Sequence, residues 1–140
     1  MNVTVQRAEN NTFIARGDSN HWVVLDTHKK HGGQDAATSP MEMVLCALGG
    51  CTGMDVESLL QKMRTPVDKF RIKISAERRE EHPRIFTKID MKFIFHGENL
   101  NADSIAKAVK LSREKYCSVS AMLAQSAQMT YEILINPTEV

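Results

Sequence analysis

The first 25 residues of this 140-residue chain alternate apolar and polar side chains in three short runs. The apolar positions of these runs are Val3 and Val5, then Phe13 and Ala15, then Trp22 to Leu25. A period of two places the apolar side chains of a strand on one face. The pattern therefore predicts three β-strands joined as antiparallel hairpins, followed by a loop from His28 to Thr38 that contains Gly32-Gly33.

A long helix is predicted to start at Pro40. Ser39 is a good N-cap, Pro40 suits the first helical turn, and Glu42 completes a capping box with Ser39. Apolar residues then recur at helical spacing until Pro66, which ends the helix because the residue before a proline disfavours helical geometry. Residues 43–51 carry no charge, so this half is apolar on every side. We expect it to be buried on every side.

A second alternating pattern predicts a long hairpin with one apolar and one charged face. Its apolar positions, interrupted by a turn near His82-Pro83, are Phe70, Ile72, Ile74, Ala76, Ile85, Ile89, Met91, Phe93 and Phe95. A second helix is predicted from Ala102 to Lys115, and a short third helix is predicted from Ser118 or Ser120 through Met129. Residues 130–135 then form a closing strand. The order βββ-α-ββ-αα-β is an α+β fold, and the length fits one domain over residues 1–140.

Charge and composition narrow the functional classes. The chain has 18 Lys+Arg and 17 Asp+Glu, and a net charge of +1 offers no basic excess for nucleic acid. We see no signal-peptide run and no stretch of transmembrane length, so we expect a cytoplasmic protein with no membrane partner. Three cysteines, an odd number, argue against a secreted disulfide framework. His28 and His31 lack the cysteine spacing of structural zinc, so no metal site and no cofactor is predicted.

Two of the three cysteines lie where helix geometry can change thiol chemistry. Cys51 follows Gly49-Gly50 inside the long helix, and two glycines there cost about 1 kcal/mol each relative to alanine. Such a cost indicates that another backbone or a ligand approaches closely. Cys117 precedes a helix start at Ser118 to Ser120, which favours the thiolate. The alternatives are a core residue for Cys51 and a half-buried junction residue for Cys117, and Cys46 is predicted to pack in the core.

A reactive Cys51 would need a cation nearby. The residue lies in the middle of a helix, where the macrodipole is weak, and Asp55 one turn later would oppose ionisation. Arg16, at a strand end, is the candidate cation, with a solvated surface arginine as the alternative. Glu42 could orient this arginine, although the capping box already explains its presence.

The start of the long helix and the two cysteine segments resemble the OsmC/Ohr family of thiol peroxidases. The matching residues are Thr38-Ser39-Pro40-Met41-Glu42, Cys51 eleven residues after Pro40, and Lys115-Tyr116-Cys117-Ser118-Val119. The resemblance covers essentially the whole chain and includes the order of the elements. The segments Ser75 to Glu81 and Pro83 to Thr87 are most similar to the small YhfA-like branch of this family.

The resemblance implies an intertwined homodimer whose long central helices pack together, with sites at the subunit interface. Cys51 would attack an organic hydroperoxide, and Cys117 would resolve the sulfenic acid as a disulfide that a dithiol reductant opens. Arg16 would stabilise the Cys51 thiolate, and Glu42 would hold the arginine. In the peroxidases the functional glutamate directly follows the proline. Here that position is Met41, and the shift to Glu42 turns the carboxylate by about 100° on the helix.

Two functions stay open at this point. The first is a thiol peroxidase that uses a Cys51/Cys117 dithiol–disulfide cycle. The second is a non-catalytic dimer of the same scaffold that binds a small apolar molecule or a thiol ligand. Met41 and the mid-helix position of Cys51 favour the second. A metal-binding protein is a third hypothesis with less support than either.

Overall fold

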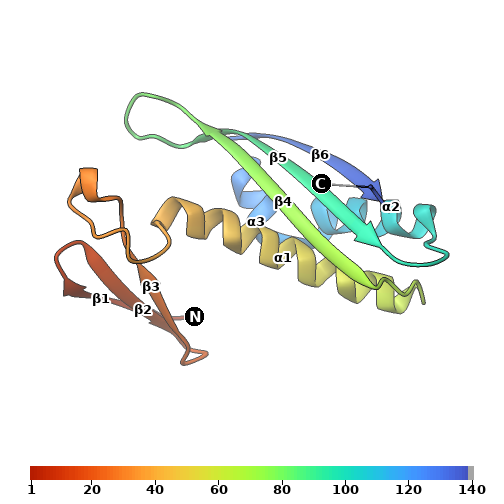
Figure 1. Cartoon of the computed structure of the whole chain (residues 1–140), viewed down its shortest axis with the longest axis horizontal. Coiled ribbons are helices and arrows are strands. Elements are labelled where there is room, and N and C mark those ends of the chain that lie inside the picture. Colours follow the sequence, from red (N-terminus) through yellow and green to blue (C-terminus); the bar gives the residue numbers. More distant parts are fainter. Residues whose placement is uncertain (139–140) are drawn as a thin grey trace. The chain divides into compact units, whose positions relative to one another are not determined.

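The computed structural model describes residues 1–138 and comprises two units, Met1–Cys46 and Ala47–Val140 (Figure 1). The first unit contains an antiparallel sheet of order β1-β2-β3. Its strands are β1 (Val3–Glu9), β2 (Thr12–Gly17) and β3 (Trp22–Leu25), as the alternating pattern predicted. All seven residues of β1 are exposed.

A buried carboxylate organises the loop after β3. Asp26 is 2% exposed and accepts backbone N–H bonds from Thr27, Gln34 and Ala36 at 2.7, 3.1 and 2.9 Å. These bonds, that of Ala36 above all, lower the pKa of Asp26. A Cβ at Gly33 would lie 1.8 Å from the carbonyl oxygen of Thr27, so only glycine fits the loop there. The loop also includes a 3₁₀ turn over Lys29–His31.

The predicted capping box is confirmed at the start of helix α1 (Pro40–Lys62). Glu42 accepts hydrogen bonds from the backbone N–H and the hydroxyl of Ser39, at 2.9 and 2.6 Å. The N–H of Glu42 lies 3.4 Å from the Ser39 hydroxyl oxygen. This reciprocal pairing satisfies donors that a helix start otherwise leaves without partners.

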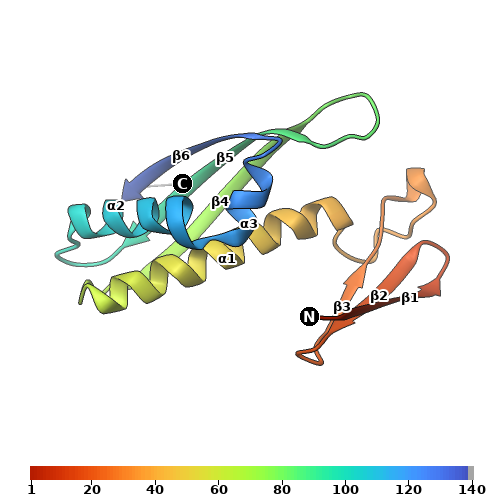
Figure 2. The same ribbon diagram turned by 180° about the vertical axis from the view of Figure 1, so that it is seen from behind.

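The second unit is a three-stranded sheet with helices on one face (Figures 1 and 2). Strand β5 (Phe86–His96) is central, antiparallel to β4 (Lys69–Arg78) and parallel to β6 (Gln128–Ile135). Helices α2 (Ala102–Leu111) and α3 (Ser118–Leu123) lie in the crossover from β5 to β6 that a parallel pair requires. The predicted order βββ-α-ββ-αα-β is confirmed.

The core of the second unit lies between this sheet and its helices. Its fully buried apolar residues are Leu48, Val56, Leu60, Ile89, Met91, Phe93, Phe95, Ile105, Ala108 and Val109. The ring of Phe70 stacks on that of Phe95 with centroids 4.5 Å apart. Helix α1 approaches β4 at glycines: a Cβ on Gly49 would lie 3.2 Å from Cδ1 of Ile74. The close approach of Ile74 therefore explains the glycine at position 49 within one chain. A Cβ on Gly50 would meet nothing within 4 Å, so no contact within residues 1–138 explains the second glycine.

Helix α1 departs from the prediction of burial on every side. Its buried positions are Leu48, Thr52, Val56 and Leu60, a single stripe with a four-residue spacing. Cys46 is exposed rather than packed in the core, because the chain covers only this one stripe. By length and composition α1 is also apolar enough to cross a membrane, contrary to our expectation. Buried core helices of soluble proteins pass the same test.

Two further boundaries in the crossover were predicted wrongly. The second helix keeps α geometry only to Leu111, and Ser112–Tyr116 form a π-helical turn. The third helix ends at Leu123 rather than Met129, since β6 begins at Gln128 to pair with Lys88 of β5. Strand pairing therefore overrides the helical spacing of apolar residues in this segment.

Candidate functional site

Three side chains that can donate electron pairs meet within the second unit. One ligand atom each of Cys51, Asp55 and Cys117 lies within 4.8 Å of the others. Cys51 and Asp55 are one turn apart on α1, so they share a face of the helix. Cys117 arrives from the crossover between β5 and β6. The structure thus brings together the two cysteines that the sequence selected.

The π-helical turn sets the position of Cys117. The N–H of Cys117 donates to the carbonyl oxygen of Ser112 at 2.8 Å, a five-residue step. Short π-helical turns within helices are frequent at functional sites. Cys117 then becomes the N-cap of α3, and its Sγ accepts the backbone N–H of Ser120 at 3.4 Å. One hydrogen bond thus holds the backbone of Cys117 and another holds its sulfur.

Burial governs the chemistry of Cys117. The residue is 2% exposed, and desolvation is the largest influence raising the pKa of its thiol, with Cys51 adding to the increase. The hydroxyl of Thr52, 3.3 Å from the sulfur, and the N–H of Ser120 lower the pKa without overcoming burial. The helix start at Ser120 thus lowers the pKa of Cys117 as expected, but burial outweighs it and the net effect is a raised pKa.

Asp55 has a defined place in this cluster. Its carboxylate is half-buried and accepts a hydrogen bond from the hydroxyl of the fully buried Ser112, Oγ to Oδ2, at 3.0 Å. From the sequence, Asp55 was expected only to oppose ionisation of Cys51. Thr52, Ser112 and Ser120 were not predicted as neighbours of the site. In the sequence, the one feature that could have indicated these three residues is that each carries a hydroxyl group and lies close in the chain to Cys51 or Cys117.

Arg16 and Glu42 belong to the first unit. The guanidinium of Arg16 donates to Asn20 Oδ1 at 2.9 Å and lies 4.8 Å from the ring centroid of Trp22. Glu42 is engaged in the capping box, and its hydrogen bonds with Ser39 lower the pKa of its carboxyl. The roles of Arg16 and Glu42 at Cys51 stay predictions.

The two loop histidines show no metal-site geometry of their own. Nδ1 of His28 lies 2.7 Å from Oδ1 of Asp35. This contact is the main cause that lowers the pKa of Asp35. Within residues 1–138, neither His28 nor His31 belongs to a group of three potential metal ligands.

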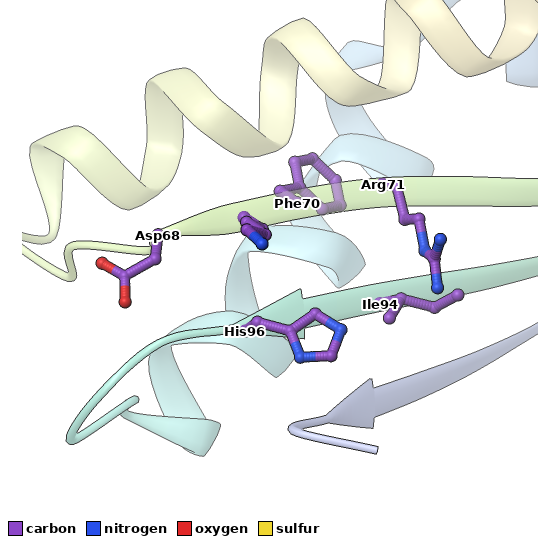
Figure 3. A pocket seen from close by; sticks show the side chains of 6 residues that line it. Asp68, Phe70, Arg71, Ile94 and His96 are labelled. Carbon is purple, nitrogen blue, oxygen red and sulfur yellow. The ribbon is translucent and has the colours of Figure 1, made fainter. Parts of the chain in front are cut away.

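A separate hollow lies where β4 begins and β5 ends (Figure 3). It is lined by Asp68, Lys69, Phe70, Arg71, Ile94 and His96. In the strand register Lys69 pairs with His96 and Arg71 with Ile94, so these four side chains share one sheet face. No candidate residue from the sequence analysis lines it.

Several known proteins are similar to this chain in sequence. The family model for OsmC-like protein matches residues 32–132. Protein YhfA of Escherichia coli strain K12 is 44% identical over 136 residues, which cover 96% of this chain and 98% of that protein.

Solved structures extend the similarity to the backbone. A hypothetical protein from Aquifex aeolicus VF5 is 30% identical with a TM-score of 0.81, and the match covers 97% of each chain. An organic hydroperoxide resistance protein from Elizabethkingia anophelis shares the fold at 10% identity, with a TM-score of 0.71 and coverage of 96% of this chain and 94% of that one. With the family model matching most of its length, the chain belongs to the OsmC-like family.

Proposed function

We propose that this protein is a thiol peroxidase that reduces organic hydroperoxides through Cys51 and Cys117. The observation that carries the proposal is the approach of the two sulfurs to within 4.8 Å. The fold shared with a hydroperoxide resistance protein supports a redox-related role. The need for a dithiol reductant agrees with a cytoplasmic location.

The cycle uses each thiol once. The Cys51 thiolate attacks the terminal oxygen of the hydroperoxide and the O–O bond breaks, and the leaving alkoxide takes from solvent the proton that Cys51 released on ionisation to depart as the alcohol. The resulting Cys51 sulfenic acid is attacked by Cys117, which loses its proton as a disulfide forms and water departs. A dithiol then reduces the disulfide and is itself oxidised. A buried Cys117 with a raised pKa suits the resolving role, because it competes less well than Cys51 for the peroxide.

In this proposal the positive charge of Arg16 stabilises the thiolate form of Cys51. Arginine keeps its charge when desolvated, so it suits a partly buried thiolate. Asn20 and Trp22 already orient the Arg16 side chain. Glu42 is proposed as its carboxylate partner, although its capping bonds to Ser39 compete with that role.

We also propose that the working form is a homodimer packed along α1. Cys46, Gly50 and the 75%-exposed Met54 form an uncovered stripe at four-residue spacing, on the side of the helix opposite Leu48 and Thr52. Small residues in such a stripe let a second α1 approach closely, and a two-fold axis pairs the stripe with itself.

Sedimentation equilibrium should give twice the chain mass of 15.7 kDa at micromolar protein. Gly50→Leu should shift the mass toward one chain, because a side chain at Gly50 has room in the single chain but not between two helices. A folded wild-type protein with single-chain mass at this concentration would contradict the dimer.

Peptide mapping tests the proposed chemistry. After one equivalent of cumene hydroperoxide, mass spectrometry should find Cys51 joined to Cys117 and Cys46 as a free thiol. Chains separated under denaturing conditions should show the bridge within one chain. A disulfide to Cys46, or three free thiols after peroxide treatment, would contradict the proposed Cys51/Cys117 peroxidase cycle.

The alternative is a non-catalytic dimer that binds a small apolar molecule or a thiol ligand. The capping role of Glu42 favours it, because a carboxylate held by Ser39 is less available to orient an arginine. Under this alternative the mapped protein would keep free thiols after peroxide, or carry a mixed disulfide after incubation with a small disulfide such as cystine.

A further inference from the structure

We propose that the reduced protein binds one Zn²⁺ per chain through Cys51, Asp55 and Cys117. Two sulfurs and a carboxylate oxygen form a donor set that zinc accepts, and their atoms already lie within 4.8 Å of one another. The proposal shares its cysteines with the proposed peroxidase but needs no peroxide chemistry. It predicts a metal-bound state of the same site.

The distances suit a tetrahedral ion. Zinc bonds of about 2.3 Å to sulfur and about 2.1 Å to oxygen place the donor atoms roughly 3.5–3.8 Å apart. Closing from at most 4.8 Å to that separation requires side-chain shifts of about 1 Å. Rotation of the Cys51 and Asp55 side chains on α1 can supply these shifts, since both residues are only half-buried. Three protein ligands leave the fourth position to water or a small ligand.

A supporting shell of hydrogen bonds surrounds two of the three ligands. Ser112 donates to Asp55 Oδ2 at 3.0 Å and leaves the second carboxylate oxygen for the ion. The N–H of Ser120 donates to the sulfur of Cys117, and the Thr52 hydroxyl lies 3.3 Å from it. Such outer partners orient metal ligands and stabilise a thiolate once it forms.

Binding and oxidation exclude one another at this site. Zinc displaces into solvent whichever protons the two thiols still carry, and no electron moves. A Cys51–Cys117 disulfide removes both sulfur ligands, so oxidation releases the ion. Conversely, bound zinc occupies the Cys51 sulfur and prevents its attack on peroxide.

Titration of the reduced, metal-free protein tests the site. Zn²⁺ should bind one to one in competition with a chromophoric chelator, with release of at least one proton at neutral pH. Co²⁺ in place of zinc should give the near-ultraviolet charge-transfer band of thiolate ligation. Asp55→Asn should weaken zinc binding at least 10-fold, and Cys117→Ser should weaken it further. Cys46→Ser is the matched control and should leave affinity unchanged.

Wild-type protein oxidised with diamide provides a test without substitution. It should lose zinc binding and regain it after reduction with a phosphine. Equal affinity of wild type and Asp55→Asn, or zinc retained by the Cys51–Cys117 disulfide form, would overturn the proposal. Peroxide-driven disulfide formation is measured separately in metal-free protein, so failure of the peroxidase and failure of the zinc site give different results.

Discussion

Cys51→Ser is expected to lower the rate of cumene hydroperoxide consumption by at least about 100-fold, because serine offers no thiolate at neutral pH. The assay follows peroxide loss with purified protein and excess dithiothreitol. Cys46→Ser is the matched control, since this exposed cysteine has no part in the proposed cycle and should leave the rate unchanged. Consumption by Cys51→Ser at the wild-type rate would exclude Cys51 as the attacking residue.

Two further variants in the same assay separate the proposed roles. Cys117→Ser, reacted with peroxide before dithiothreitol is added, should consume about one equivalent and leave Cys51 as a sulfenic acid that dimedone traps. Arg16→Met should slow consumption while the circular dichroism spectrum stays unchanged, because the side chain is exposed. If Arg16→Met reacts as fast as wild type, another group ionises Cys51.

Phe93→Ala is expected to reduce the free energy of unfolding by about 3–5 kcal/mol. Phe93 is fully buried on the central strand β5, and its ring lies 6.4 Å from that of Phe70. Removing the ring leaves a cavity between the sheet and the helices, which the strand pairing on both sides of β5 prevents from closing. The loss is a large share of the stability of a typical domain.

Urea unfolding measures this effect, with protein concentration held fixed so that any dimerisation contributes equally. Tyr131→Ala is the control on the neighbouring strand. Tyr131 is 43% exposed and Arg113 Cζ lies 3.6 Å from its ring centroid, so its loss should cost about 1 kcal/mol. Equal losses for the two variants would show that Phe93 is not a core residue in solution.

The sequence predicted those parts of the fold where local pattern and tertiary burial agree. The alternation of Phe70 to Ala76 identified β4 because one sheet face packs on helices and the other meets solvent. The spacing failed at Met129, because pairing with Ile89 decides its conformation. The charge-free half of α1 indicated burial, yet one chain buries a single stripe of it.

The two cysteines of the site could be predicted from the sequence, whereas the residues that surround them could not. Cys51 and Cys117 could be selected because thiols carry distinctive chemistry. Thr52 contacts Cys117 across 65 positions of the chain, a proximity that no local pattern encodes. The π-helical turn after Leu111 was likewise invisible, since its five-residue hydrogen bonds depend on packing rather than on residue type.

The parallel pairing of β5 with β6 has a consequence for how the chain matures. Such a pair cannot form from a tight turn, so the crossover that carries Cys117 must close before β6 finds its register. Distant contacts of this kind form late in folding, because loop closure costs entropy before pairing compensates it. Cys51 and Cys117 are likewise far apart in the chain, so we expect their contact to form late in folding as well.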